Sequence, residues 1–206
     1  MSQAAELADR LRGAIRDERV LAAIAAIPRD PFVPERERAR AYENVALPIA
    51  CDQTISQPLV VARMLELLAL RPSDRVLDVG TGSGYHAALL ATLAGHVWTI
   101  ERHSQLTAYA RETIASLGID NVEFVVGDGW YGLPDQAPFE AINVAAATGA
   151  SPPAALERQL APAGRLVAPV GAANQRLVLV RRTAEGFERT RLEAVRFVPL
   201  VHGPER

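Results

Sequence analysis

The stretch Val76–Gly84, with the sequence VLDVGTGSG, constrains the fold of this chain more than any other. An apolar run passes directly into three alternating glycines, and the helix-forming run YHAALLATLA follows. Glycine tolerates left-handed backbone and lets a ligand approach closely, while the free N–H groups of a helix N-terminus attract hydrogen-bond acceptors. The pattern therefore predicts a strand, a ligand-binding turn and a helix.

The spacing of the glycines indicates which cofactor the turn would hold. Gly80, Gly82 and Gly84 form a G-x-G-x-G pattern, whereas the dinucleotide fingerprint is G-x-G-x-x-G/A. Tyr85 stands where that fingerprint has its last small residue. Glu101 ends the next strand-like run, where a carboxylate can accept hydrogen bonds from both ribose hydroxyls. This combination favours S-adenosylmethionine over NAD, and a glycine turn without any ligand is the remaining alternative.

The composition excludes several classes of function. The 206 residues suffice for one α/β domain with a small N-terminal addition, and the net charge of −2 implies no basic face for nucleic acid or an anionic membrane. All 22 basic residues are arginines, which excludes lysine-dependent phosphate loops and Schiff-base chemistry. Cys51 is the single cysteine, and the four histidines show no metal-ligand spacing. We expect a cytoplasmic monomer without metal, membrane or nucleic-acid partner.

Apolar spacing predicts the order of helices and strands. Residues 3–27 carry a helical stripe, residues 35–50 resemble a charged linker or short helix, and a second helix begins near Pro58. From Asp74 onward strands alternate with helices. His86 could line the cofactor pocket, but the surface of a helix is the favoured interpretation. The expected strands are 75–79, 96–100, 122–126, 139–145, 165–170, 176–182 and 193–199, and the later helices are 84–94, 104–117 and 153–161.

This order predicts a doubly wound, Rossmann-like α/β fold with a mostly parallel seven-stranded sheet and N-terminal helices. The last two strands are close in sequence and are expected to be antiparallel. We expect residues 1–73 to form an N-terminal cap on the substrate side and residues 74–206 to form the cofactor-binding core, within one compact unit. Ligands of such sheets bind beyond the carboxyl ends of the strands, where the glycine turn, Glu101 and Asp128 all fall.

Two further polar segments are expected near this edge. Gly127, Asp128 and Gly129 close the third strand, and the aspartate could accept a hydrogen bond from an adenine amino group; the alternative is an ordinary Asp-Gly turn. Ser56 lies just before Pro58, where its hydroxyl could cap the helix or act on a substrate. On spacing alone, capping is the favoured interpretation.

Segments along nearly the whole chain resemble the protein-L-isoaspartate O-methyltransferase family, repair enzymes that methylate the abnormal isoaspartyl carboxylate. The most specific motif is QTISQP at Gln53–Pro58, whereas the glycine turn is generic to class I methyltransferases. The other matching segments are PFVP at 31–34, AY at 41–42, ALP at 46–48, LDVGTGSGY at 77–85, GDG at 127–129, APF at 137–139, GRL at 164–166, PVG at 169–171 and FVPL at 197–200.

The resemblance implies roles for individual residues. Ser56 matches the family's active-site serine, and Thr54 and Ile55 would lie beside the cofactor. The residues expected to bind S-adenosylmethionine, and its product S-adenosylhomocysteine, are Asp78, Gly80, Gly82, Ser83, Glu101, Arg102, Gly127, Asp128 and Gly129. The substrate side would include Ala145, Ala146 and Val201. The family fold is similar to the Rossmann type with a rearranged order of the final strands.

The implied reaction is methyl transfer from S-adenosylmethionine to L-isoaspartyl residues of damaged proteins or peptides, which initiates repair through a succinimide. A side-chain carboxylate with an ordinary pKa of about 4 is ionised at neutral pH, so no general base is required. Ala145 stands where the family usually has threonine or glycine, which leaves open a carboxyl methyltransferase acting on aspartate of a dedicated peptide. An NAD-dependent oxidoreductase and a non-catalytic adenosine-binding module are the alternatives from other classes.

Overall fold

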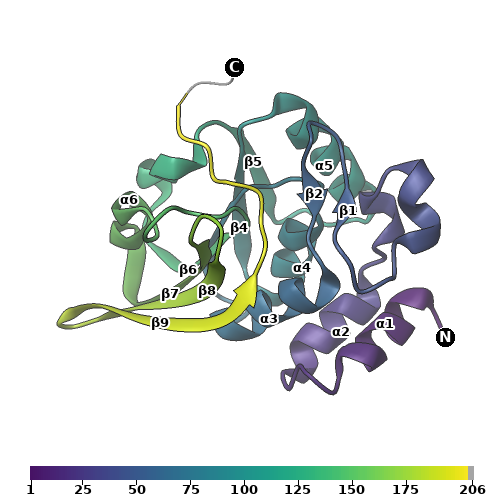
Figure 1. The fold of residues 1–206 in the computed structure, drawn as a ribbon, viewed down its shortest axis with the longest axis horizontal. Helices are drawn as coiled ribbons and strands as arrows, with labels where there is room; N and C mark the ends of the chain where they lie inside the picture. Colours follow the sequence, from purple (N-terminus) through teal and green to yellow (C-terminus); the bar gives the residue numbers. More distant parts are fainter. Residues whose placement is uncertain (204–206) are drawn as a thin grey trace.

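A seven-stranded sheet forms the centre of the computed structural model, which describes residues 1–203 (Figure 1). Its order is β5-β4-β3-β6-β7-β8-β9. The strands are β3 (Arg75–Val79), β4 (His96–Glu101), β5 (Val122–Val126), β6 (Phe139–Val144), β7 (Leu160–Val170), β8 (Gln175–Thr183) and β9 (Gly186–Val195). The strands from β5 to β7 are parallel, and β8 is antiparallel to both of its neighbours. The predicted mostly parallel, doubly wound sheet is therefore confirmed.

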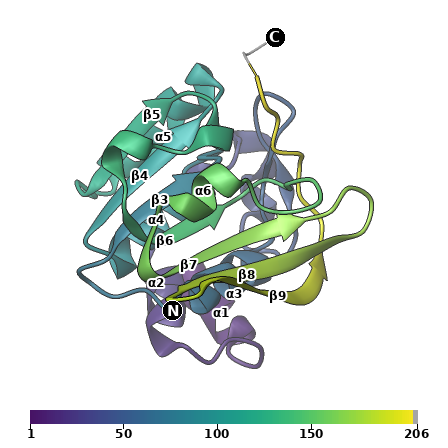
Figure 2. The ribbon, with the colours of Figure 1, turned by 90° about the vertical axis from the view of Figure 1, so that its left-hand side faces the viewer.

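Helices cover the two faces of this sheet unequally. One face packs against α3 (Pro58–Leu68), α4 (Tyr85–Leu93) and α5 (Ser104–Ser116). On this side α2 (Glu18–Ala26) contacts α3 and α4 and also packs against α1 (Gln3–Leu11). The other face carries the short helix α6 (Ala154–Arg158), visible in front of the sheet in Figure 2. Among the described residues, no helix is long and apolar enough to cross a membrane.

The N-terminal apolar stripe is buried as predicted, but it belongs to two helices and not to one over residues 3–27. Ser2 caps the first helix and Asp17 caps the second, each with its side chain accepting a backbone N–H of the first turn, and Gly13 lies between them. The stripe residues in the core are Leu7, Leu11, Ile15, Val20, Leu21, Ile24 and Ile27. The same core cluster includes apolar side chains of the sheet, so the boundary at residue 73 stays a prediction.

Two other predicted boundaries were wrong. The helix expected at 153–161 is only the short α6, because β7 begins directly after it and pairs with β6 from its first residue. The strand expected at 193–199 is the end of the longer β9, after which the chain leaves the sheet. The segment 35–50, predicted to be a charged linker or short helix, does contain a short helix, the 3-10 helix η2 (Glu35–Arg40), and the short strand β1 (Leu47–Pro48) follows it.

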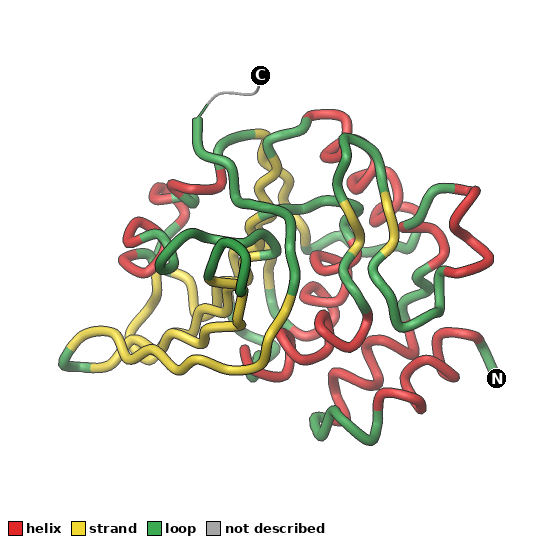
Figure 3. The backbone as a smooth tube through the Cα atoms, in the orientation of Figure 1, coloured by secondary structure: helices red, strands yellow, loops and turns green. Residues whose placement is uncertain are grey.

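From β3 the strand order runs outward through β4 to β5, and the chain then returns to place β6 on the other side of β3. The order therefore changes direction between β3 and β6, which is a topological switch point. Here the Ala145 N–H donates to the Val79 carbonyl at 2.8 Å, and the Gly80 N–H donates to the Ile100 carbonyl at 2.9 Å. Ligands of doubly wound sheets bind at such a point. Residues 196–203 follow β9 as an irregular segment that passes over this edge (Figure 3).

Candidate active site

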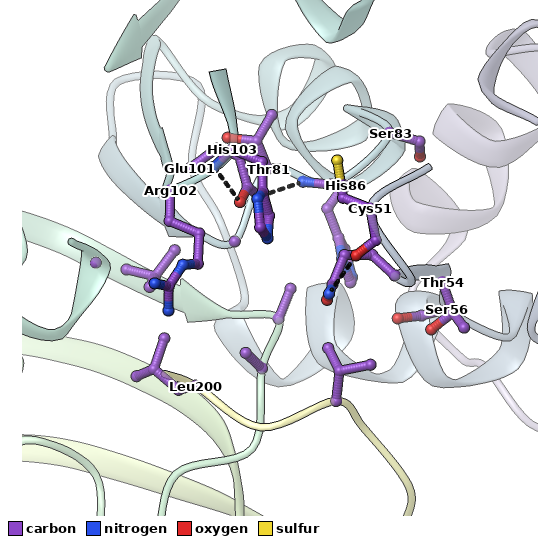
Figure 4. A pocket seen from close by; sticks show the side chains of 18 of the residues that line it. Cys51, Thr54, Ser56, Thr81, Ser83, His86, Glu101, Arg102, His103 and Leu200 are labelled. Atoms are coloured by element: carbon purple, nitrogen blue, oxygen red, sulfur yellow. Dashed lines mark hydrogen bonds between the residues drawn. The ribbon is translucent and has the colours of Figure 1, made fainter. Parts of the chain in front are cut away.

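A cavity of about 620 Å³ lies at the switch point, bordered by the segments that follow β3, β4 and β6 (Figure 4). The expected site residues that line it are Thr54, Ile55, Ser56, Gly80, Gly82, Ser83, Glu101, Arg102, Gly129, Ala145, Ala146 and Val201. The lining does not include Asp78, Gly127 or Asp128. Within residues 1–203 no group of three or more histidine, cysteine or acidic side chains is arranged to hold a metal ion.

The glycine turn is held open by backbone conformations that other residues rarely adopt. Gly80, Gly82 and Gly84 have φ angles of +91°, +52° and +93°. The Glu101 carboxylate closes the turn, because one oxygen accepts the Gly82 N–H at 2.9 Å and the other accepts the His103 N–H at 3.1 Å. Each carboxylate oxygen keeps a further lone pair, so Glu101 can still accept hydrogen bonds from a ligand in the cavity.

Asp78 supports this turn from inside the sheet and does not reach the cavity, contrary to the expectation that it binds the cofactor. Its side chain is fully buried and accepts hydrogen bonds from the Thr99 hydroxyl at 2.9 Å and the Asn143 amide at 2.7 Å. Thr99 shares a further hydrogen bond with Thr81 of the turn at 2.6 Å. Burial raises the pKa of Asp78 to about 7, although the two hydrogen bonds oppose that rise.

The QTISQP motif reaches the cavity on a tight hairpin of β1 and β2 (Thr54–Ile55). The two turn residues of this hairpin, Cys51 and Asp52, precede the motif. Their φ angles are 56° and 55°, and a type I′ turn requires positive φ at both central positions. Glycine, asparagine and aspartate are favoured there, so Asp52 suits the turn and the strain of about 1–2 kcal/mol falls on Cys51. The Gln53 side chain steadies the turn by donating to the Cys51 carbonyl at 2.9 Å. The strand that follows leads directly to Ser56.

The hydroxyl of Ser56 does not cap α3, so the interpretation from spacing was wrong. Gln57 is the N-cap residue and forms no side-chain cap bond. Instead, the side chain of Asn44 accepts the Leu59 N–H at 3.0 Å, and Pro58 has no N–H to satisfy. No hydrogen bond joins the Ser56 hydroxyl to any other described residue. The hydroxyl is therefore available to a ligand.

A second, open groove of about 700 Å³ joins the cavity at Ser56. Its other lining residues are Ala46, Thr54, Gln57, Val60 and residues 194–198. Thr54, Ser56 and Val198 line both the cavity and the groove. Figure 4 shows Thr54 and Ser56 together on one side of the cavity, with Arg102 and Leu200 on the other. A ligand in the groove would thus meet a ligand in the cavity at the Ser56 hydroxyl.

Asp128 faces the C-terminal segment and does not line the cavity. One carboxylate oxygen accepts the Trp130 N–H at 2.9 Å, and the other contacts the Gly203 N–H and His202 Nδ1, each at 2.9 Å. Burial alone would raise the pKa of Asp128, but these hydrogen bonds lower it below its ordinary value. The adjacent Gly129 does line the cavity, and a Cβ there would stand 2.5 Å from a methyl group of β3.

Tyr85 and His86 both line the cavity, where Tyr85 was not expected and His86 was only the less favoured alternative. The prediction that His86 lies on a helix surface was wrong, because α4 is packed between the sheet and the N-terminal helices. Burial lowers the pKa of His86 to about 4. Within the described part of the chain, the Tyr85 hydroxyl and His86 Nε2 are buried without a hydrogen-bond partner. The available signal is that α4 is apolar on nearly every side, which is typical of a buried helix.

The relatives of the chain agree with this architecture. A family model described as Protein-L-isoaspartate(D-aspartate) O-methyltransferase matches residues 3–205. A protein-L-isoaspartate O-methyltransferase from Koribacter versatilis is 54% identical over 193 residues, which cover 93% of this chain and 86% of that protein. A solved structure of the same name has a TM-score of 0.86 at 27% identity, and covers 96% of this chain and 65% of its own.

A further solved structure shows what one such protein binds. It is a protein-L-isoaspartate O-methyltransferase from Plasmodium falciparum in complex with S-adenosyl-L-homocysteine, and it has a TM-score of 0.85 at 26% identity. The match covers 98% of this chain and 99% of that one. The resemblance found in the sequence is confirmed: the chain belongs to the protein-L-isoaspartate(D-aspartate) O-methyltransferase family.

Proposed function

We propose that this chain transfers the methyl group of S-adenosylmethionine to the side-chain carboxylate of L-isoaspartyl residues in damaged proteins or peptides. One observation carries the proposal: the glycine-turn cavity and the open groove meet at Ser56, within the motif most specific to the family. The cavity beside the glycine turn suits a nucleoside cofactor, and the groove beside it suits a peptide of varied sequence. Succinimide formation from the methyl ester then follows without further help from the protein.

The residues around the cavity fit S-adenosylmethionine. Glu101 offers carboxylate lone pairs to the ribose hydroxyls, and the glycine turn leaves the backbone accessible. The unpartnered Tyr85 hydroxyl and His86 Nε2 are polar atoms that a bound ligand or its water would satisfy. His86 is neutral at pH 7, so it adds no positive charge beside a sulfonium. When bound, the cofactor supplies an electrophilic methyl group.

The chain itself has to orient one carboxylate oxygen and exclude water. The acceptor is already ionised at neutral pH, since the ordinary pKa of such a group is about 4. The Ser56 hydroxyl donates a hydrogen bond to this carboxylate and aligns it with the methyl group, because it lies where the groove enters the cavity. Positioning of this kind contributes as much as about 7–11 kcal/mol to lowering a reaction barrier.

A pair of peptides tests the proposed substrate. We would incubate the protein with methyl-labelled S-adenosylmethionine and a short isoaspartyl peptide, using the aspartyl isomer as the matched control. Base-labile label on the isoaspartyl peptide alone supports the proposal. Label on the aspartyl peptide, or on neither peptide while the cofactor binds, contradicts it. The second outcome favours a dedicated peptide substrate, for which Ala145 in the cavity lining is the only structural argument.

The variant Ser56→Ala tests the assigned role of the serine. We expect kcat to fall about a hundredfold, as when another positioned hydrogen-bond donor is removed from an active site, while the Kd of S-adenosylmethionine stays nearly unchanged. Steady-state kinetics and calorimetry measure the two quantities. Ser73→Ala, which alters an exposed serine just before β3, is the control. A parallel loss of turnover and cofactor binding would assign Ser56 a structural role instead.

We infer the wider setting from composition. The net charge of −2 suits a protein without nucleic-acid partners, and a single cysteine suits the reducing cytoplasm. We expect a monomer, since residues of this chain line both the cavity and the groove. Sedimentation at micromolar concentration tests the oligomeric state, and a dimer would overturn that part of the proposal.

A further inference from the structure

Arg29 is an arginine without access to solvent. Its exposed fraction is 0%, and it directly precedes the 3-10 helix η1 (Asp30–Phe32). Its guanidinium donates hydrogen bonds to the backbone carbonyls of Ala41 at 2.5 Å, Ser56 at 2.9 Å and Val45 at 3.5 Å. No carboxylate pairs with it among the described residues. Burial lowers its pKa to about 10, so Arg29 is still cationic at neutral pH.

A buried charge without an opposite charge costs several kcal/mol of stability unless other groups compensate it. For Arg29 the compensation comes from carbonyl dipoles of two separate segments, the loop at residues 41–45 and the QTISQP motif. The guanidinium carbon also stands 5.6 Å from the ring centroid of Tyr85, the first residue of α4. Arg29 thereby joins the Ser56 segment to the helix that follows the glycine turn.

The contact with the Ser56 carbonyl bears directly on the reaction. A peptide unit is planar, so a group that holds the Ser56 carbonyl oxygen restrains the position of the Cα from which the Ser56 side chain leaves. The Ser56 hydroxyl has no hydrogen bond of its own to a described residue, and Pro58 contributes no N–H to the start of α3. The backbone anchor at Arg29 therefore restrains where the Ser56 side chain begins, while rotation about its own bonds sets the direction of the hydroxyl.

We propose that Arg29 is a positioning residue for methyl transfer, which holds the Ser56 backbone in place relative to the cofactor cavity and affects the reaction through Ser56. This inference rests on the proposed function and on the role assigned there to the Ser56 hydroxyl. Arg29 touches neither cavity nor groove, since it is absent from the lining of both. Its guanidinium does pack against Tyr85 of the cavity lining, so cofactor binding is measured beside turnover, and the main effect is expected in turnover.

A double-mutant cycle with Arg29→Lys and Ser56→Ala tests the proposal. Lysine keeps the charge but has its donors on a single nitrogen, so it cannot reproduce contacts that Arg29 makes from two separate nitrogens. With Ser56 present, we expect Arg29→Lys to lower kcat on an isoaspartyl peptide roughly tenfold to a hundredfold, because small misplacements of a positioning group have effects of that size. With Ser56→Ala, the same change should alter kcat less than about twofold, because residues that act as one unit are not additive.

Arg165→Lys is the control. Arg165 is also largely buried and donates to two carbonyls, those of Leu68 and Ala69. Unlike Arg29 it pairs with a carboxylate, that of Asp74 at 2.8 Å, and it lies away from the cavity and the groove. Its replacement should lower thermal stability without a selective fall in kcat. Urea unfolding of every variant gives the folded fraction by which kcat is normalised. Arg29→Gln, which removes the charge but keeps donors, enters the same cycle if Arg29→Lys does not fold.

The outcomes separate the two proposals. Equal falls in kcat with and without the Ser56 hydroxyl, or a fall that matches the loss of folded protein, overturn the positioning role while leaving the methyltransferase assignment intact. A wild-type protein that does not methylate the isoaspartyl peptide overturns the proposed function, and the role of Arg29 with it. A strong weakening of cofactor binding by Arg29→Lys also contradicts the proposal, because it would place the effect in the cavity.

Discussion

Asp78→Asn tests the buried acid beneath the glycine turn. Asparagine has nearly the same shape, can still accept the hydrogen bond from Asn143 and can donate one to Thr99. The substitution therefore removes the titrating group and keeps its hydrogen-bond partners. Because Asp78 does not line the cavity, the main effect should appear in the stability of the protein and in its dependence on pH.

The size of the effect follows from the pKa of the buried group. Burial raises the pKa of Asp78 from 3.8 to about 7 in the folded protein. Between these pH values the folded state holds a proton that the unfolded state has released, so the unfolding free energy of the wild type falls as the pH rises. Each pKa unit corresponds to about 1.36 kcal/mol, so the unfolding free energy of the wild type falls by at most about 4 kcal/mol in total. About 3 kcal/mol of this fall occurs between pH 5 and pH 8.

Urea unfolding at pH 5 and pH 8 measures this difference. The unfolding free energy of Asp78→Asn minus that of the wild type should increase by as much as about 3 kcal/mol from pH 5 to pH 8. Asp135→Asn, which removes an exposed carboxylate, controls for the general loss of one negative charge. A difference between variant and wild type that is the same at both pH values, or that shrinks at pH 8, would refute the reasoning.

Two further substitutions probe the glycine turn and Glu101, the carboxylate that closes it. Gly84→Ala would place a Cβ 2.9 Å from that of Ala110 at a φ of +93°, and we expect it to lower the unfolding free energy by about 2–5 kcal/mol. Gly118→Ala is the control, because Gly118 also has a positive φ, +73°, but a Cβ there would meet nothing within 4 Å. It should lower the unfolding free energy by only about 1–2 kcal/mol. Equal losses in the two variants would contradict the packing argument. Glu101→Gln should weaken S-adenosylmethionine binding about tenfold in calorimetry, because a charged acceptor becomes neutral, and an unchanged Kd would exclude Glu101 from ribose binding.

Most of the fold could be predicted from local sequence patterns. The strand, glycine turn and helix of residues 76–94 were recognised because the backbone preferences of glycine and the spacing of apolar residues act over a few neighbouring positions. The alternation after Asp74 then required a parallel sheet, and its topology brought the glycine turn and Glu101 to one edge. The family motif QTISQP predicts that Ser56 lies in the site, and Ser56 does line the cavity.

The boundaries that were wrong depended on partners elsewhere in the chain. The segment 3–27 forms two helices and not one, because Asp17 caps the second helix. The helix expected at 153–161 is shorter, because the chain from Leu160 onward pairs with β6 as a strand. In the same way, Ser56 loses its capping role to Asn44, which lies 15 positions before Leu59. The spacing of apolar residues predicts neither the strand pairing nor the cap from Asn44, because it does not show which distant segments are in contact.

The class of fold, the presence of a cofactor site at the sheet edge and the family can be predicted from the amino-acid sequence, since they depend on local conformation and on motif identity. Which polar groups are buried, and what they contact, depends on the packing of distant segments. Packing places Asp78 beneath the turn, buries His86 and sets Arg29 against the carbonyl of Ser56. Arg29 and Ser56 are 27 positions apart in the chain, and only the packed core brings them within hydrogen-bonding distance.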